Sequence, residues 1–136
     1  MKILALDLGD QWTGIALSDL SRMFAKPYTT VMTAHLEQFL AEFLAQESID
    51  IIVMGYPKTM RGTESDQTRK VVEVKNNLEK KFSEQTWILW DERLSSKRAQ
   101  MVGSGKTKEE KLKSHAIAAA FILDSYLTFL INQTQV

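Results

Sequence analysis

Carboxylates stand at the ends of two apolar runs in this sequence. Asp7 closes the run Ile3–Leu6, and Asp91 and Glu92 directly follow the run Thr86–Trp90. A carboxylate has no packing use among aliphatic residues, because its charge must be paired or bind a cation. Hard divalent cations prefer carboxylate oxygens, and two of them about 3.5–4 Å apart can activate water for phosphodiester hydrolysis. Asp7, Glu92 and Asp91 are therefore candidate metal ligands.

Each of these carboxylates also has a purely structural interpretation. Asp7 can cap the turn that follows its run of apolar residues. Asp91 or Glu92 can pair with Arg93, or can cap a helix that begins after Leu94. Short acidic motifs often occur without a functional site. The local sequence leaves both interpretations open.

Basic side chains gather in two segments that could contact a phosphate backbone. The loop Gly55–Gly62 contains Lys58 and Arg61, and its backbone N–H groups would add further donors. An ordinary loop, with glycine and proline supplying the turns, explains the same residues. The densest basic patch consists of Lys106, Lys108, Lys111 and Lys113. A solvated helix start explains this patch as well as a phosphate-binding surface does.

The overall composition is that of a single globular domain, residues 1–136. Hydrophobic residues make up 44% of the chain and charged residues 25%, with 17 basic and 17 acidic side chains that cancel. A neutral chain gives no bulk attraction to nucleic acid, so any such surface must be local. There is no cysteine, which excludes disulfides and thiolate sites. No signal peptide and no membrane-spanning run is apparent, so we expect a cytoplasmic protein without a membrane partner.

The periodicity of the apolar residues predicts an α/β fold. Strands are expected at about 3–7, 14–17, 28–32, 50–54 and 86–90, and helices at 34–47, from 63 onward, at 95–102 and at 107–130. An antiparallel meander followed by crossover helices predicts a mixed five-stranded sheet with helices on both faces, as in the ribonuclease H-like fold. Ligands of such sheets bind beyond the carboxyl ends of the strands, where Asp7 and Asp91 are expected.

Four sequence blocks resemble the YqgF/RuvX family of pre-16S ribosomal RNA nucleases, which is related to Holliday-junction resolvases. The blocks are Asp7-x-Gly9 with Gly14–Asp19, Gly55-x-Pro57 with Met60-x-Gly62-x-Glu64, Asp91–Ala99, and Ala118–Leu127. Their order and spacing over nearly the whole chain make the resemblance specific. It implies a metal-dependent nuclease site with Mg²⁺ or Mn²⁺, in which Asp7 and Glu92 are ligands and Asp91 is a neighbour or alternate. Arg93 would orient the acids or contact phosphate.

The sequence departs from the family pattern at His115. The family usually carries an aspartate there, three residues before the Ala118–Ala119 pair. A histidine on an apolar helix face is also explained as an ordinary core residue. As a ligand it would remove one negative charge from the site and suit Mn²⁺ better than Mg²⁺, which prefers oxygen ligands. It could instead position the attacking water, so the resemblance makes His115 a candidate catalytic residue.

The resemblance implies an endonuclease that cleaves structured RNA, specifically the 5′ end of pre-16S rRNA, in contact with the ribosome. We expect a monomer or weak homodimer. One alternative is a resolvase that acts on branched DNA, and another is a catalytically silent RNA- or ribosome-binding module in which His115 marks a lost cation site. An actin-like ATP-binding protein shares the Asp-x-Gly opening, but it needs a second domain for which 136 residues leave no room.

Overall fold

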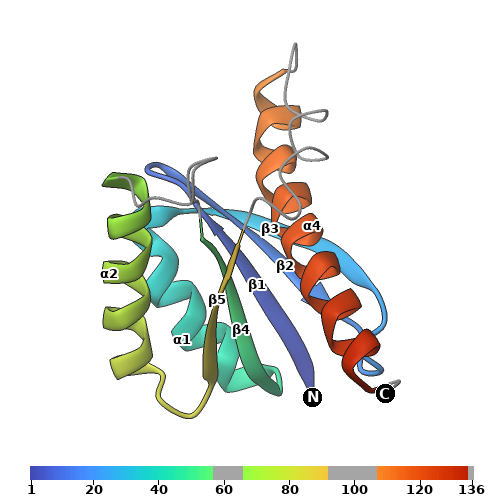
Figure 1. The fold of residues 1–136 in the computed structure, drawn as a ribbon. Helices are drawn as coiled ribbons and strands as arrows, with labels where there is room; N and C mark the ends of the chain where they lie inside the picture. Colours follow the sequence, from blue (N-terminus) through green and yellow to red (C-terminus); the bar gives the residue numbers. More distant parts are fainter. Residues whose placement is uncertain (57–65, 92–106, 135–136) are drawn as a thin grey trace.

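The computed structural model describes residues 1–56, 66–91 and 107–134 (Figure 1). The strands are β1 (Lys2–Leu8), β2 (Trp12–Ser18), β3 (Ala25–Met32), β4 (Ile49–Tyr56) and β5 (Thr86–Asp91). The helices are α1 (Leu36–Gln46), α2 (Asp66–Lys81) and α4 (Lys108–Thr134), and a 3-10 turn, η1 (Thr33–His35), precedes α1. The helix expected at 95–102 lies outside the described residues.

The five strands form one mixed sheet in the order β3-β2-β1-β4-β5. β1 pairs antiparallel with β2, β2 pairs antiparallel with β3, and β4 lies parallel between β1 and β5. In Figure 1, α1 and α2 cover one face of the sheet and α4 covers the other. The prediction of a mixed five-stranded sheet with helices on both faces is confirmed.

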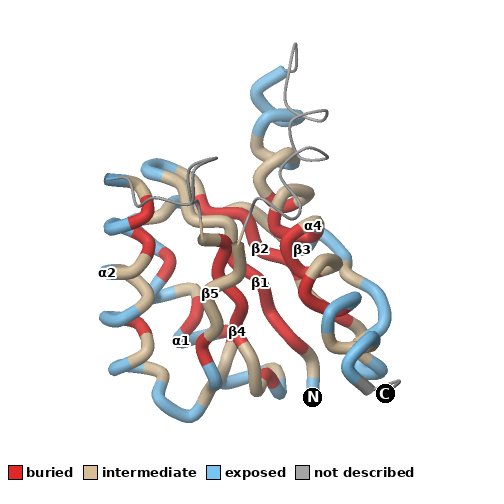
Figure 2. The backbone as a smooth tube through the Cα atoms, in the orientation of Figure 1, coloured by how far each residue is buried: buried red, intermediate tan, exposed pale blue. Residues whose placement is uncertain are grey.

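Side-chain alternation along the central strands divides the core into two halves. Figure 2 shows that the central strands β1 and β4 are buried along much of their length. Leu4 and Leu6 of β1 pack with α1 and α2, whereas Ile3 and Ala5 pack with α4. All of them are fully buried. Successive side chains of a strand point to opposite faces, so a strand covered on both faces must be apolar at every position. Odd-numbered residues of β1 therefore face α4, and even-numbered residues face α1 and α2.

Small side chains line the contact between the sheet and α4. Ala5 of β1 and Ala16 of β2 share a buried cluster with Ala119 and Ala120 of α4. Short side chains on both sides let the helix backbone lie close to the strands. By length and composition alone, α4 could cross a membrane over Lys108–Gln133. Its packing against four strands explains that apolar composition as the composition of a core helix.

The edge strand β3 begins earlier than its sequence suggests. The residues after Pro27 were expected to form the strand, but β3 starts at Ala25. Ala16 pairs with Pro27 while Ile15 pairs with Thr29, so the register shifts between these two positions. Proline has no N–H to donate, and an edge strand with a bulge accommodates it.

The tryptophans of β5 face opposite sides of the sheet, as their three-residue spacing predicts. Trp87 is buried in the α1–α2 half of the core. Trp90 packs against the α4 half, where its Nε1 donates a hydrogen bond to Ser125 Oγ at 3.0 Å. Its ring also meets Tyr126 edge-on at 5.3 Å. β5 is thereby anchored to both helix layers just before Asp91.

The turn between β2 and β3 is organised around Asp19. Its Oδ1 accepts hydrogen bonds from the backbone N–H groups of Met23 and Phe24, both at 2.9 Å. The hydroxyl of Ser21 donates to Oδ2. Arg22 adopts a left-handed conformation with φ of 60° and binds the carboxylate of Asp50. The Ser21 hydroxyl first, and then the Phe24 N–H, lower the pKa of Asp19 to about 2.

We expect the Asp19→Asn variant to be less stable than wild type near neutral pH and to differ less from it in acid. A carboxyl pKa that is lower in the folded than in the unfolded chain stabilises the fold above the unfolded value of 3.8, and this contribution disappears as the pH falls toward about 2. Urea unfolding at pH 6, 4 and 2.5 measures the difference. Ser21→Ala is the matched control, because it should raise the pKa of Asp19 in an NMR titration. A stability difference that is unchanged across this range would contradict the assignment.

Candidate functional site

Asp7 lies near the carboxyl end of β1, on the face of the sheet that α4 covers. It has the same strand parity as Ile3 and Ala5, which pack against α4. It is half-buried and stands directly opposite Gly14 of β2. The neighbouring strand β4 runs parallel to β1, so both strands end at this edge of the sheet. Asp7 therefore occupies the position at which α/β sheets bind ligands.

Gly14 holds the backbone of α4 against β2 at His115. A Cβ atom on Gly14 would lie 1.8 Å from the carbonyl oxygen of His115 and 2.8 Å from the N atom of Ala116. Real Cβ atoms do not approach backbone atoms this closely, so only glycine permits the contact. Because Gly14 is the cross-strand partner of Asp7, the helical turn that carries His115 crosses the sheet next to Asp7.

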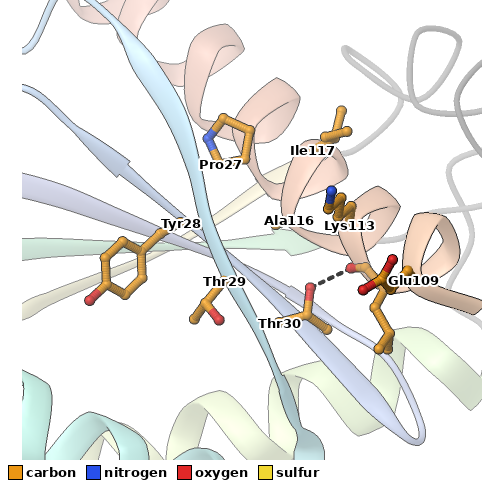
Figure 3. A pocket seen from close by; sticks show the side chains of 9 residues that line it. Pro27, Tyr28, Thr29, Thr30, Glu109, Lys113, Ala116 and Ile117 are labelled. Carbon is orange, nitrogen blue, oxygen red and sulfur yellow. Dashed lines mark hydrogen bonds between the residues drawn. The ribbon is translucent and has the colours of Figure 1, made fainter.

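Thr30 of β3 ties the same helical turn to the sheet. Its Oγ1 donates a hydrogen bond to the carbonyl oxygen of Leu112 at 2.5 Å (Figure 3). Thr30 is paired with Gly14, which is paired with Asp7, so the three residues form one row across three strands. We call Asp7, Gly14 and Thr30 the cradle row. The row fixes where the Leu112–Ala116 turn lies relative to the carboxylate of Asp7.

A chain of hydroxyl groups anchors the hairpin that carries Asp7. The Oγ1 of Thr33 donates to the carbonyl oxygen of Gly9 at 2.7 Å and lies 2.9 Å from the Oγ1 of Thr13. A hydroxyl has one proton, so Thr13 must be the donor to Thr33. The N–H of Thr33 also donates to the carbonyl oxygen of Gln11 at 2.9 Å. The hairpin tip is thereby tied to η1, which rigidifies the carboxyl end of β1.

The structure does not bring Asp91 to the face that carries Asp7. Asp91 ends β5 opposite Tyr56, and it has the same strand parity as Trp87 and Leu89. Those two side chains belong to the α1–α2 half of the core. Strand alternation thus places Asp91 on the other side of the sheet from Asp7. Glu92 follows Asp91 in the sequence and lies outside the described residues.

The predicted basic residues divide between the described and the undescribed parts of the chain. Like Glu92, the basic residues Lys58, Arg61, Arg93 and Lys106 lie outside the described residues. Lys108 and Lys113 are exposed in the first turns of α4, the same end of the helix that carries His115. Lys113 directly follows Leu112, whose carbonyl oxygen accepts the hydrogen bond from Thr30.

The donor chemistry of Asp7 fits a hard divalent cation, but one carboxylate does not make a site. Within 1–56, 66–91 and 107–134, no three His, Asp or Glu side chains form a metal-binding group. Asp7 and His115 would supply one oxygen and one nitrogen donor from neighbouring elements, and the sequence offers Glu92 as the next carboxylate. Mn²⁺ accepts such a mixed donor set more readily than Mg²⁺.

Sequence reasoning missed the functions of Gly14 and Thr30. In the sequence, Gly14 belongs to a block that resembles the family, and Thr30 lies in the strand expected at 28–32. A glycine inside a strand often marks a close approach of another backbone, and this signal was present at Gly14. No local signal identifies Thr30, because its hydrogen bond joins residues 82 positions apart.

Comparison with known proteins identifies relatives over most of the chain. The model of the RuvX family, described as "Holliday junction resolvase", matches residues 1–128. A protein of Rubrobacter xylanophilus named "Putative pre-16S rRNA nuclease" is 35% identical over 131 residues, which is 93% of this chain and 91% of that protein. A protein of Christiangramia forsetii with the same name is 36% identical over 131 residues, with coverage of 93% and 97%.

Two solved structures have the same fold at low sequence identity. T. thermophilus RuvC in complex with a Holliday junction substrate is 12% identical with a TM-score of 0.60, over 95% of this chain and 96% of that chain. The Fowlpox virus resolvase in complex with Holliday junction DNA is 16% identical with a TM-score of 0.53, over 96% and 99%. The prediction of a ribonuclease H-like fold is confirmed by these neighbours.

Proposed function

Because the chain belongs to the RuvX family, we propose that it is a metal-dependent endonuclease that cleaves structured RNA. The single observation that carries this proposal is the position of Asp7, a half-buried carboxylate at the carboxyl end of β1, beside the α4 turn that bears His115. A nuclease needs ligands for a cation at an edge that is open to a long polymer. Asp7 would supply the first of these ligands from the carboxyl edge of the sheet, where α/β sheets bind their ligands.

The proposed substrate is the 5′ end of pre-16S rRNA. Relatives that match more than nine-tenths of this chain carry the name of a pre-16S rRNA nuclease. We expect the protein to act in the cytoplasm, as a monomer or weak homodimer, on precursor RNA associated with the ribosome. Cleavage of branched DNA is the second candidate, because resolvases with the same fold are bound to Holliday junctions.

In the proposed mechanism Asp7 and Glu92 would hold divalent cations, and the imidazole of His115 would favour Mn²⁺ over Mg²⁺. Such cations would lower the pKa of a bound water and offset the negative charge that develops on the phosphate. Asp7 fixes the position of the site, because its strand is anchored at both the hairpin tip and the cradle row. His115 orients the attacking water or completes the ligand set. Lys108 and Lys113 bind flanking phosphates and hold the strand in line.

We expect the purified full-length protein to cleave a precursor RNA that spans the 16S 5′ end when Mn²⁺ is present, more slowly with Mg²⁺, and not in EDTA. The same protein should leave a four-way DNA junction intact. Gel analysis of end-labelled substrates measures both reactions. If the protein cleaves the DNA junction but not the RNA, it is a resolvase and the proposed RNA substrate is wrong. Tight RNA binding without cleavage of either substrate would identify a silent binding module.

A further inference from the structure

A cavity of about 500 Å³ lies between the edge strand β3 and the first half of α4 (Figure 3). Its lining includes Pro27, Thr30, Glu109, Leu112, Lys113 and Ile117. Its size falls within the range of sites that hold small organic groups. The cavity is open at the surface, so a group attached to a longer polymer can enter it.

The cavity exists because α4 lies close to β2 while the sheet ends at β3. Gly14 brings the helix backbone down onto β2, and β3 is the last strand on this side. The flank of α4 that extends past β3 therefore has no further strand beneath it. Leu112 and Ile117 remain only half-buried there. The floor of the cavity is thus apolar surface that the fold leaves uncovered.

Two opposite charges stand at the entrance to this apolar floor. Glu109 and Lys113 are four residues apart on α4 and both are exposed. Neither of them forms an ion pair within the described part of the chain. A matching ligand has a flat apolar body, an anionic group for Lys113 and an N–H donor for Glu109. A nucleotide has all of these when its base is unpaired, and a carboxylate accepts hydrogen bonds from the exocyclic amino group of a base.

The cavity adjoins the proposed cleavage site through Thr30. Thr30 lines the cavity and is also the outer member of the cradle row, two strands away from Asp7. Neighbouring strands are about 4.8 Å apart, so the cavity wall lies about 10 Å from the strand that carries Asp7. This separation suits a nucleotide next to the one whose phosphate is cut.

We propose that this cavity binds one unpaired base of the RNA strand that is cleaved, and that Glu109 favours bases with an exocyclic amino group. The proposal rests on the proposed function, because it assigns a substrate subsite to the same site. It makes an unpaired nucleotide beside the scissile bond a recognition element. Lys113 then contacts the phosphate of that nucleotide, and the apolar floor contacts the face of its base.

The test measures RNA binding apart from cleavage. Full-length protein is titrated in EDTA with a fluorescent RNA hairpin that carries a single bulged adenosine, and anisotropy gives the Kd. The Ile117→Trp variant fills the cavity and should weaken binding about tenfold, the loss expected when one base contact is removed. Thr128→Trp is the matched control, since Thr128 is exposed on the same helix outside the cavity, and it should bind like wild type.

A second variant tests base selection without altering the core. Glu109→Leu, which removes the acceptor oxygens, should bind bulged adenosine and bulged uridine with equal affinity, whereas wild type prefers adenosine. Glu42→Leu, at an exposed position on α1, should keep the wild-type preference. Circular dichroism and melting curves establish that each variant is folded.

Three outcomes would overturn the subsite. These are wild-type affinity in Ile117→Trp, an unchanged adenosine preference in Glu109→Leu, or a change of oligomeric state in Ile117→Trp, which would assign the cavity to a second copy of the chain. Loss of binding in Ile117→Trp, in a protein that cleaves no RNA with any metal, would support the subsite and contradict the nuclease proposal. The experiments therefore distinguish a failure of the base-binding subsite from a failure of the nuclease proposal.

Discussion

The Asp7→Asn variant should lose more than about 100-fold in Mn²⁺-dependent RNA cleavage while keeping its fold. Replacing residues that only support a metal ligand already costs about 10- to 100-fold, so replacing a ligand itself should cost more. Asparagine has the same shape as aspartate, which preserves the packing of the half-buried side chain at the end of β1. Single-turnover cleavage measures the loss, and Mn²⁺ titration followed by electron paramagnetic resonance measures the metal affinity.

Asp10→Asn is the matched control for this result. Asp10 lies three residues further along the same hairpin, is exposed, and pairs with Lys70 at 3.4 Å. An exposed pair of this kind contributes little to stability. Cleavage by Asp10→Asn should stay within a few-fold of wild type. If Asp7→Asn cleaves as well as Asp10→Asn does, Asp7 is a structural cap and the proposed metal site is wrong.

The Gly14→Ala variant should be the most destabilising single-methyl change in the described sheet. The added Cβ would meet the carbonyl oxygen of His115 at 1.8 Å and its carbonyl carbon at 2.2 Å. These are backbone atoms of a long helix, so the whole turn must move away from β2. Overpacking of a core typically costs about 1–3 kcal/mol, and we expect about 3 kcal/mol because no side chain can yield. For a chain of this size that corresponds to a fall in melting temperature of about 10 °C.

A variant at Thr30 tests the position of the Leu112–Ala116 turn with a smaller loss of stability than Gly14→Ala causes. Thr30→Val keeps the shape of the side chain but removes the hydrogen bond to the Leu112 carbonyl, at a cost of about 1 kcal/mol. It should lower the cleavage rate more than the substrate affinity, and Thr30→Ser should restore the rate. The imidazole NMR signals are simple to assign, because the chain has 2 histidines. Only the His115 signal should shift in Thr30→Val, and the His35 signal should stay in place.

A stable Gly14→Ala protein with full activity would show that α4 does not rest on β2 as described. An unshifted His115 signal in Thr30→Val, together with unchanged cleavage, would show that the cradle row does not position the helix. These two variants probe the same turn from neighbouring strands. If both variants lose cleavage activity, the loss is assigned to a displaced His115.

Local pattern was sufficient to predict the architecture. The continuous apolar runs in β1 and β4, the helical spacing in α1 and the acid at the end of β1 are all properties of neighbouring residues. They depend on the period of the backbone, which is 2 residues in a strand and about 3.6 in a helix. The prediction of a mixed sheet with Asp7 at its carboxyl edge followed from these periods.

Boundaries were predicted less well than elements. β3 begins at Ala25 because a bulge at its pairing with β2 lets Pro27 join an edge strand. Proline normally indicates the end of a strand, and only the position of β3 at the edge of the sheet reverses that expectation. Strand order is a property of the whole chain, so a local reading of Pro27 could not give it.

The sequence by itself determined the fold class, the family and the candidacy of Asp7, because these depend on residue type and short spacing. Tertiary structure alone decided which parts meet. It placed the backbone of His115 on Gly14, tied Leu112 to Thr30, and put Asp91 on the face opposite Asp7. Those relations depend on how closely α4 approaches the sheet and on the register between strands. Both are set by long-range packing, in which the missing side chain of Gly14 matters as much as any side chain that is present.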